Sequence, residues 1–194
     1  MYGKKTIPIV LASASPRRRD LLTQAGYKFI VDKSDIDESL YSTNNIEPHK
    51  YAELLALAKA KNIAPDHPDK LVIGADTIVD YDGKIIGKAA NEKQAIEIVR
   101  KLFSKPHKVI TGIAIVRIND NTEIVTHDIT TVYPRKMSPE QIKEHIKSET
   151  WKDKAGAYAI QENGDEFVER IKGSLTNVMG FPMELLERLL AKLI

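Results

Sequence analysis

The most informative stretch of the chain reads Leu11-Ala12-Ser13-Ala14-Ser15-Pro16-Arg17-Arg18-Arg19-Asp20-Leu21-Leu22. A short apolar run from Ile7 to Ala12 stops there at two serines, a proline and three arginines, as a strand does when it leads into a helix. Ser15 can cap that helix, and Pro16 suits its first position because proline has no amide hydrogen. The free amides of a first helical turn attract phosphate, and the arginines after Pro16 would add bidentate donors. The stretch therefore indicates an anion site between a strand and a helix.

Two other interpretations of this stretch are open. The first is an ordinary capped helix with a solvated basic face, because arginines are common on helix surfaces. The second is a signal peptide, in which Lys4-Lys5 precedes the apolar run and Ala12-Ser13-Ala14 is the cleavage site. The signal-peptide interpretation fails, because the apolar stretch from Ile7 to Ala14 is at or below the usual minimum length, contains Pro8 and runs directly into the arginines.

Length and composition narrow the class of protein. A chain of 194 residues can bury a core, and we expect residues 1–194 to form a single domain, either undivided or with two lobes around a cleft. The 29 basic and 27 acidic residues nearly balance, which argues against a dedicated nucleic-acid binder. The absence of cysteine excludes disulfides and fits a reducing compartment, and the five scattered histidines do not favour a preformed zinc site. No apolar run approaches the length that spans a bilayer.

Outward from the first strand and helix, apolar runs alternate with helical patterns. We expect Pro48 to open a helix that reaches about Asn62 and buries Tyr51, Leu54, Leu55 and Ala58. The other expected elements are a helix stop at Gly26, a strand from Tyr27 to Val31, a polar loop from Asp32 to Asn45, a strand from Leu71 to Val79, a type I′ turn at Asp82-Gly83 that returns through Lys84 to Ile86, a helix capped by Asn91 with Gln94, strands from Lys108 to Ile118 and from Thr122 to Tyr133, a helix capped by Ser138 with Gln141, a strand from Phe167 to Ile171, and a final helix from Met183 to Leu193. Hairpin-joined strands mixed with helices predict an α/β fold on a mixed sheet.

Asp76 is the sharpest candidate for chemistry. It follows Ile73-Gly74-Ala75, at the end of an apolar strand, where its carboxylate would be partly desolvated. Such a carboxylate could bind a divalent cation or act as a general base on water. The alternative is a buried aspartate that caps backbone amides, because buried polar groups usually have structural partners.

Three further charged residues allow both a functional and a structural interpretation. Lys88 follows Gly87, but the spacing from Gly83 and the presence of Ala89 exclude a P-loop, so Lys88 is either a point charge for phosphate or a solvated turn lysine. By itself, Lys59 on the polar border of its helix is a surface lysine. Glu38 could ligate a metal or simply solvate an acidic loop.

The order of motifs resembles the Maf family of nucleoside triphosphate pyrophosphatases, over nearly the whole chain. The resemblance is carried by Leu11 to Arg18, by Gly74-Ala75-Asp76-Thr77, by Gly87-Lys88, by Asp153 to Gln161, and by Gly173-Ser174 with Asn177 to Pro182. It implies a fold like that of inosine-triphosphate pyrophosphatases, an elongated mixed sheet with two lobes around a cleft. It also implies hydrolysis of a nucleoside triphosphate to the monophosphate and pyrophosphate, with a divalent cation, Mg²⁺ or Mn²⁺, in the cytoplasm, by a protein that is often a homodimer. From the charge balance and the short apolar runs we expect no nucleic-acid or membrane partner.

The resemblance also assigns roles to residues of this chain. Asp76 matches the proton acceptor, and Glu38 matches a second carboxylate of the pocket, so that the two are the expected metal ligands. The phosphate-binding set is matched by Ser13, Arg17, Arg18, Lys59 and Lys88.

The branch that acts on dTTP and UTP resembles this chain at Arg17, Thr77 and Gln161, and the branch that acts on 7-methyl-GTP typically differs there. Gln161 has both a donor and an acceptor and can read the imide edge of a pyrimidine. The chain departs from the family at Ala89, where proline is usual, and at Glu162, where glycine commonly follows the glutamine. We therefore expect a dTTP/UTP pyrophosphatase with a house-cleaning role, and a 7-methyl-GTP-specific enzyme or a non-catalytic nucleotide-binding regulator of cell division as the alternatives.

Overall fold

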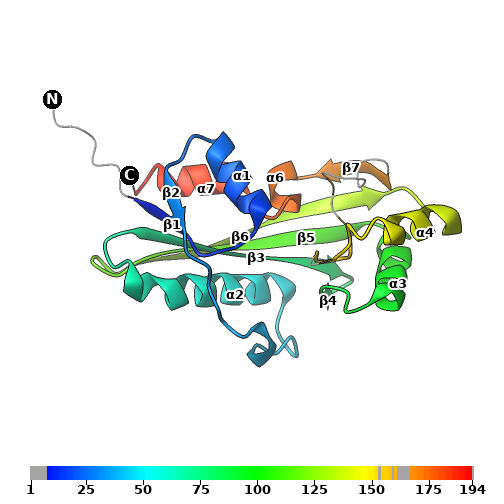
Figure 1. The fold of residues 1–194 in the computed structure, drawn as a ribbon, viewed down its shortest axis with the longest axis horizontal. Coiled ribbons are helices and arrows are strands. Elements are labelled where there is room, and N and C mark those ends of the chain that lie inside the picture. The colour runs from blue at the N-terminus through cyan, green and yellow to red at the C-terminus, as the bar shows by residue number, and fades with distance from the viewer. Residues whose placement is uncertain (1–7, 153, 159, 161–166, 194) are drawn as a thin grey trace.

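The computed structural model describes residues 8–152, 154–158, 160 and 167–193. Within these residues, seven strands form one mixed sheet in the order β2-β1-β3-β5-β6-β7, with β4 paired to β3 (Figure 1). The strands are β1 Ile9–Leu11, β2 Phe29–Val31, β3 Leu71–Tyr81, β4 Lys84–Ile86, β5 His107–Arg117, β6 Thr122–Pro134 and β7 Val168–Lys172. The helices are α1 Pro16–Gln24, α2 Pro48–Ile63, α3 Glu92–Leu102, α4 Pro139–Lys147, α6 Leu175–Val178 and α7 Met183–Leu190, with 3-10 turns η1 Glu38–Leu40 and η2 Ala64–Asp66. The α/β fold predicted from the sequence is confirmed.

The pairing of β3 leaves part of one edge of that strand without a strand partner. β1 pairs with β3 in parallel at Leu71 to Ile73 only, and β4 pairs with β3 at Val79 to Tyr81 only. On the opposite edge, β5 pairs with β3 continuously. The segment from Gly74 to Ile78 therefore borders an opening on the β1 side of β3, which we call the edge gap.

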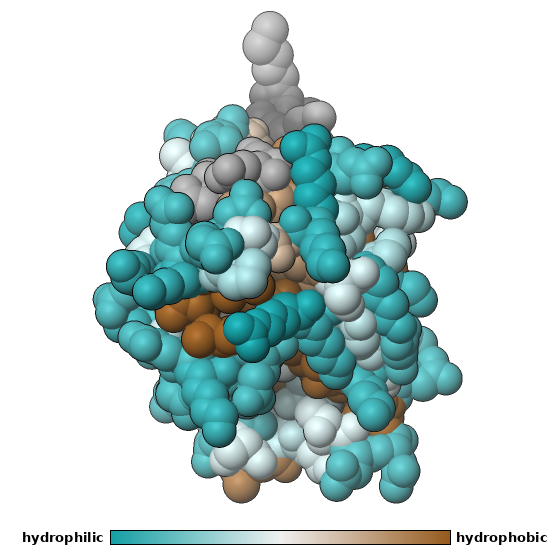
Figure 2. Space-filling view, turned by 90° about the vertical axis from the view of Figure 1, so that its right-hand side faces the viewer, coloured by the Kyte–Doolittle hydropathy of each residue, from teal (hydrophilic) through white to brown (hydrophobic). Residues whose placement is uncertain are grey.

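The helices cover the two faces of the sheet and one of its ends. α2 lies along one face, and α1, α6 and α7 lie on the opposite face, where most of the core gathers (Figure 1). α3 and α4 pack together beyond β4. Seen from that end, the surface is mostly hydrophilic, with apolar atoms visible near its centre (Figure 2).

α2 approaches the sheet very closely at two glycines. A Cβ atom at Gly74 would collide with the carbonyl oxygen of Ala56, and one at Gly112 would collide with that of Ala52. Because Gly112 is the β5 partner of Asp76, both glycines and Asp76 share the face that α2 covers. Close packing at these two points holds α2 directly above Asp76.

This close approach corrects one prediction for α2. Tyr51 and Leu55 are buried as expected, but Leu54 is 40% exposed and Ala58 is only partly buried. The fully buried positions are instead the small residues Ala52, Ala56 and Ala60, spaced four apart. Small side chains face the sheet because the close approach of α2, which the glycines allow, leaves no room for larger ones.

The local helix and turn signals are mostly confirmed. Asn91 and Ser138 accept hydrogen bonds from the amides of the third residues after them, and Asp82-Gly83 has the two positive φ angles of a type I′ turn. Pro16 occupies the first position of α1 as predicted. The prediction that the Ser15 side chain caps α1 is wrong, because it makes no capping hydrogen bond and the Ser15 amide instead donates to Ser13 Oγ at 3.2 Å.

The glycine contacts predict a specific pattern of stability. Gly112→Ala should lower the free energy of unfolding by about 1–3 kcal/mol, because an added methyl group must push α2 away from the sheet. Gly87→Ala is the matched control, since a Cβ atom there meets no atom within 4 Å. Urea denaturation of both variants measures the difference, and equal stabilities would contradict the close-packing interpretation.

Candidate active site

A cavity of about 720 Å³ opens at the edge gap. Its walls come from the turn after β1, the N-terminus of α1, the segment after β2, α2, the middle of β3, the turn at Lys88, and described residues between Lys152 and Ile160. Every predicted site residue that the structure describes lies on this wall: Ser13, Arg17, Arg18, Glu38, Lys59, Asp76, Thr77 and Lys88. Gln161 lies outside the described residues. Segments that are far apart in the sequence thus meet in one cavity.

Asp76 lies in the middle of β3, which corrects the expectation that it ends a strand. The strand continues to Tyr81 because β5 pairs with it from Val72 to Asp80, well past Asp76. Asp76 is only 8% exposed, and its Oδ1 lies 2.6 Å from Lys59 Nζ. The same ammonium lies 2.8 Å from Glu38 Oε1. The side-chain partner of Asp76 is therefore a lysine from α2, and the alternative of an aspartate that caps backbone amides is wrong.

The pKa values of the two carboxylates move in opposite directions. Burial raises the pKa of Asp76 above its ordinary value, against the opposing attraction of Lys59 and Arg18. Burial also acts to raise the pKa of Glu38, but the hydrogen bond and charge of Lys59, with the charges of Lys88 and Arg18, outweigh it and lower that pKa. Asp76 is thus the better proton acceptor of the pair, and Glu38 stays ionised.

Arg18 is held by the protein itself. Its Nε donates to the carbonyl oxygen of Gly180 at 2.8 Å, and one terminal nitrogen donates to Ser13 Oγ at 3.1 Å and to the Ala75 carbonyl oxygen at 2.9 Å. The other terminal nitrogen donates to Thr77 Oγ1 at 3.0 Å. Arg18 therefore satisfies the backbone of β3 in the edge gap, where no strand does so. Whether Arg18 also contacts phosphate stays a prediction.

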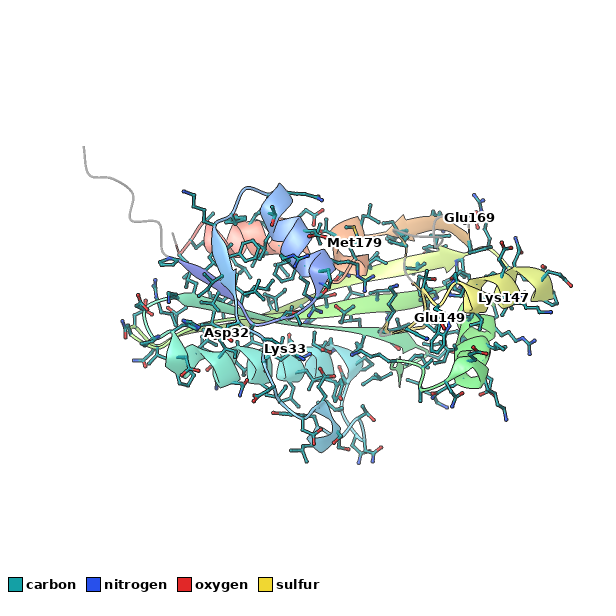
Figure 3. All side chains as sticks on the ribbon, viewed as in Figure 1. Asp32, Lys33, Lys147, Glu149, Glu169 and Met179 are labelled. Carbon is teal, nitrogen blue, oxygen red and sulfur yellow. The ribbon has the colours of Figure 1, made fainter. Side chains whose placement is uncertain are left out.

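The remaining cations extend along the cavity. Lys88 is placed by a bridge between its backbone and Ala155. Lys33, which sequence reasoning missed, follows β2 and also lines the cavity (Figure 3). The strand order could have indicated Lys33, because β1 and β2 are parallel neighbours and the residues after their carboxyl ends lie at the same edge of the sheet. Lys152 and Lys154 complete this group of additional basic residues.

The cavity wall has two chemically different sectors on opposite faces of the sheet. The polar sector consists of Glu38, Lys59 and Asp76, on the α2 side. The apolar sector consists of Val79, Val109, Tyr158, Ile160 and Met179. Val79 points away from α2 because it lies an odd number of residues from Asp76, and it packs in the large core of the opposite face. Such an arrangement can hold charged groups on one side and a flat apolar group on the other.

Tyr158 is hydrogen-bonded to a buried histidine. Its hydroxyl lies 2.7 Å from Nε2 of His107, whose Nδ1 lies 3.1 Å from the Leu102 carbonyl oxygen. Burial lowers the pKa of His107 to about 4, and burial raises the pKa of Tyr158 far above its ordinary value. Both side chains are therefore neutral at neutral pH.

Removal of the Arg18 guanidinium should destabilise the fold at the edge gap. Arg18→Met removes four hydrogen bonds and leaves the buried Ala75 carbonyl oxygen without its donor, so the free energy of unfolding should fall by at least about 2 kcal/mol. Arg19→Met, at the next position of α1, is the control, because Arg19 is exposed and forms only a surface ion pair with Asp20. Urea titrations at neutral pH compare the two, and similar losses would contradict the role assigned to Arg18.

The depressed pKa of His107 predicts acid sensitivity. Between its ordinary value of 6.5 and about 4, the unfolded chain binds a proton that the folded protein does not, so stability falls as pH falls through this window. The loss is about 3 kcal/mol at most. His107→Gln has no such titration, so the stability difference between wild type and variant should shrink by that amount from pH 7 to pH 4. Parallel stability curves would show that His107 is not buried in its neutral form.

The comparisons with known proteins point to one family and one fold. The family model described as Maf-like protein matches residues 8–193. The dTTP/UTP pyrophosphatase of Elusimicrobium minutum is 43% identical over 94% of this chain and 96% of its own, and that of Moorella thermoacetica is 43% identical over 94% and 93%. Among solved structures, the Ham1 protein of Staphylococcus aureus superimposes with a TM-score of 0.53 at 15% identity, over 96% of this chain and all of that one. The fold expected from the resemblance is thereby confirmed, and the chain belongs to the Maf family.

Proposed function

We propose that this chain is a nucleoside triphosphate pyrophosphatase that hydrolyses dTTP and UTP to the nucleoside monophosphates and pyrophosphate. The observation that carries the proposal is the buried Asp76 carboxylate in a cavity that is otherwise lined by many cations. The relatives that align with this chain over almost their full lengths are named dTTP/UTP pyrophosphatases, and these names supply the reaction and the substrates.

The reaction needs an attacking water molecule and a stabilised leaving group. The water oxygen attacks the α-phosphorus, the bond from that phosphorus to the oxygen bridging to the β-phosphorus breaks, and pyrophosphate leaves. Asp76 accepts the proton that the water loses, which its raised pKa favours. Lys59 Nζ, which lies 2.6 Å from Asp76 Oδ1, fixes the orientation of the carboxylate during this step.

The cations and the α1 N-terminus neutralise the triphosphate. Arg17, which precedes Asp76 in the sequence, and Lys88, which follows it, both line the cavity. Lys33 adds a charge from the segment after β2. The first turn of α1 adds the free backbone amides of the residues after Pro16, which itself has no amide hydrogen. Fixed positive charges of this kind stabilise the charge that develops on the leaving phosphates.

The polar sector fits a divalent cation in the manner usual for nucleotide enzymes. Asp76 and Glu38 approach the same ammonium group, so the two carboxylates lie close together. Mg²⁺ in such sites takes one or two carboxylates and completes its coordination with phosphate oxygens and water. Among the described residues, no cluster of three or more acidic or histidine ligands exists, which agrees with a cation that is shared with the substrate. When bound, the cation would neutralise phosphate charge.

The apolar sector is the proposed site for the base. Aliphatic and aromatic walls suit a flat ring, and a fixed wall favours a small pyrimidine over a purine. Thr77 donates or accepts a hydrogen bond with Thr111 Oγ1 at 3.0 Å and also accepts one from Arg18, so its contact with a base stays a prediction.

In the described residues, no helix is long and apolar enough to cross a membrane. The cytoplasmic location and the homodimer also stay predictions.

The central test replaces Asp76 without changing its size. Asp76→Asn should lower turnover of dTTP at least about a hundredfold, because it removes the proton acceptor and a metal ligand. Asp80→Asn is a matched control from the same strand and face, since Asp80 is equally buried but accepts a hydrogen bond from the Gly83 amide and does not line the cavity. Pyrophosphate release by purified protein with Mg²⁺ or Mn²⁺ measures both.

The same assay on dTTP, UTP, CTP, ATP, GTP and 7-methyl-GTP tests the substrate class. We expect dTTP and UTP to be hydrolysed with the highest kcat/KM. A preference for a purine would contradict the base specificity, and absence of turnover with every nucleotide would contradict the activity itself.

A further inference from the structure

The hydrogen bonds of His107 determine which of its nitrogens carries a proton. A carbonyl oxygen can only accept, so the 3.1 Å contact with Leu102 requires a hydrogen on Nδ1. In the neutral ring Nε2 is then an acceptor, and the hydroxyl of Tyr158 must donate to it. His107 is 3% exposed and does not line the cavity, so it cannot itself contact a ligand there.

The Tyr158 ring is held from several directions. Phe103 meets it edge to face with a centroid distance of 5.3 Å, and the His107 ring meets it in the same manner at 5.5 Å. The hydroxyl bond to His107 fixes the far end of the side chain. The ring can therefore form a wall of the apolar sector in one orientation only.

The loop that carries Tyr158 needs such support. Gly156 and Ala157 both have positive φ angles, which alanine adopts only when its surroundings hold it there. The Gly156 amide donates to the Gly87 carbonyl oxygen at 3.1 Å, beside Lys88, and His145 lies 2.8 Å from the Ala157 carbonyl oxygen. The loop thus connects the cation at Lys88 to the apolar sector.

We infer that His107 is a positioning residue for nucleotide binding: it holds the Tyr158 ring as the wall against which the base lies, without touching the substrate. The inference rests on the proposed function, and it explains a buried polar pair that the hydrolysis itself does not use. Without His107, the buried Tyr158 hydroxyl would have to find another partner, and the ring would leave its orientation.

The test compares three variants in dTTP hydrolysis. His107→Leu removes both hydrogen bonds of the ring, His107→Gln keeps a donor and an acceptor, and Tyr158→Phe removes only the hydroxyl. We expect His107→Leu and Tyr158→Phe to raise KM about fivefold or more, as the loss of one hydrogen bond implies, with kcat changed less than about twofold. Inhibition by pyrophosphate should not change, because pyrophosphate has no base. His107→Gln should restore most of the wild-type KM.

Two further measurements show whether both residues act through one bond. In the double variant with His107→Leu and Tyr158→Phe, KM should be no higher than in the worse single variant, because the hydrogen bond between the two side chains can be lost only once. His127→Leu is the control, since His127 is bonded to Glu53 on α2 and does not line the cavity, and its KM should stay unchanged.

Each outcome decides between the inference and the proposed function. An unchanged KM in His107→Leu and Tyr158→Phe, with an active wild type, would overturn the positioning role and leave the function intact. An inactive wild-type protein would overturn the function and the inference that rests on it. If His107→Leu does not fold, Tyr158→Phe breaks the same hydrogen bond and decides the test alone.

Discussion

The contact on which the rest of the site depends is the close approach of α2 to the sheet at Gly74 and Gly112. Only the absence of Cβ atoms at these positions lets the helix backbone descend onto β3 and β5. Lys59 is thereby brought within 2.6 Å of Asp76, a pair of charges that would be costly to bury separately. The ion pair between Lys59 and Asp76 thus depends on the close packing of two glycines against a row of alanines.

The second constraint is the edge gap in the sheet. β1 is too short to cover β3 beyond Ile73, and the exposed backbone of β3 would attract another strand if it were left open. Arg18 covers it instead, because its guanidinium donates to the Ala75 carbonyl oxygen and to neighbouring groups. One opening in the sheet consequently serves as a cavity, and the side chains that alternate along β3 give it a charged side and an apolar side.

Local signals could be predicted from the sequence, and long-range contacts could not. The caps at Asn91 and Ser138 join residues three positions apart, so their patterns were sufficient. The exposure of Leu54 depends on glycines from distant strands, which helical periodicity in α2 does not contain. By its own sequence context Lys59 was a surface lysine, and only the family resemblance placed it in the pocket. The hydrogen bond from Arg18 to Gly180 spans 162 positions, beyond any local pattern.

We propose that the nucleotide lies in the edge gap, with its α-phosphate beside Asp76 and its base against the apolar sector. A crystal structure with Mg²⁺ and a dUTP analogue that has a non-hydrolysable α,β-bridge would show where each part of the nucleotide binds. We expect the α-phosphorus beside Asp76, the phosphates at the N-terminus of α1, and the uracil ring against Tyr158. A base stacked in the polar sector near Glu38, or a nucleotide bound outside the edge gap, would contradict it.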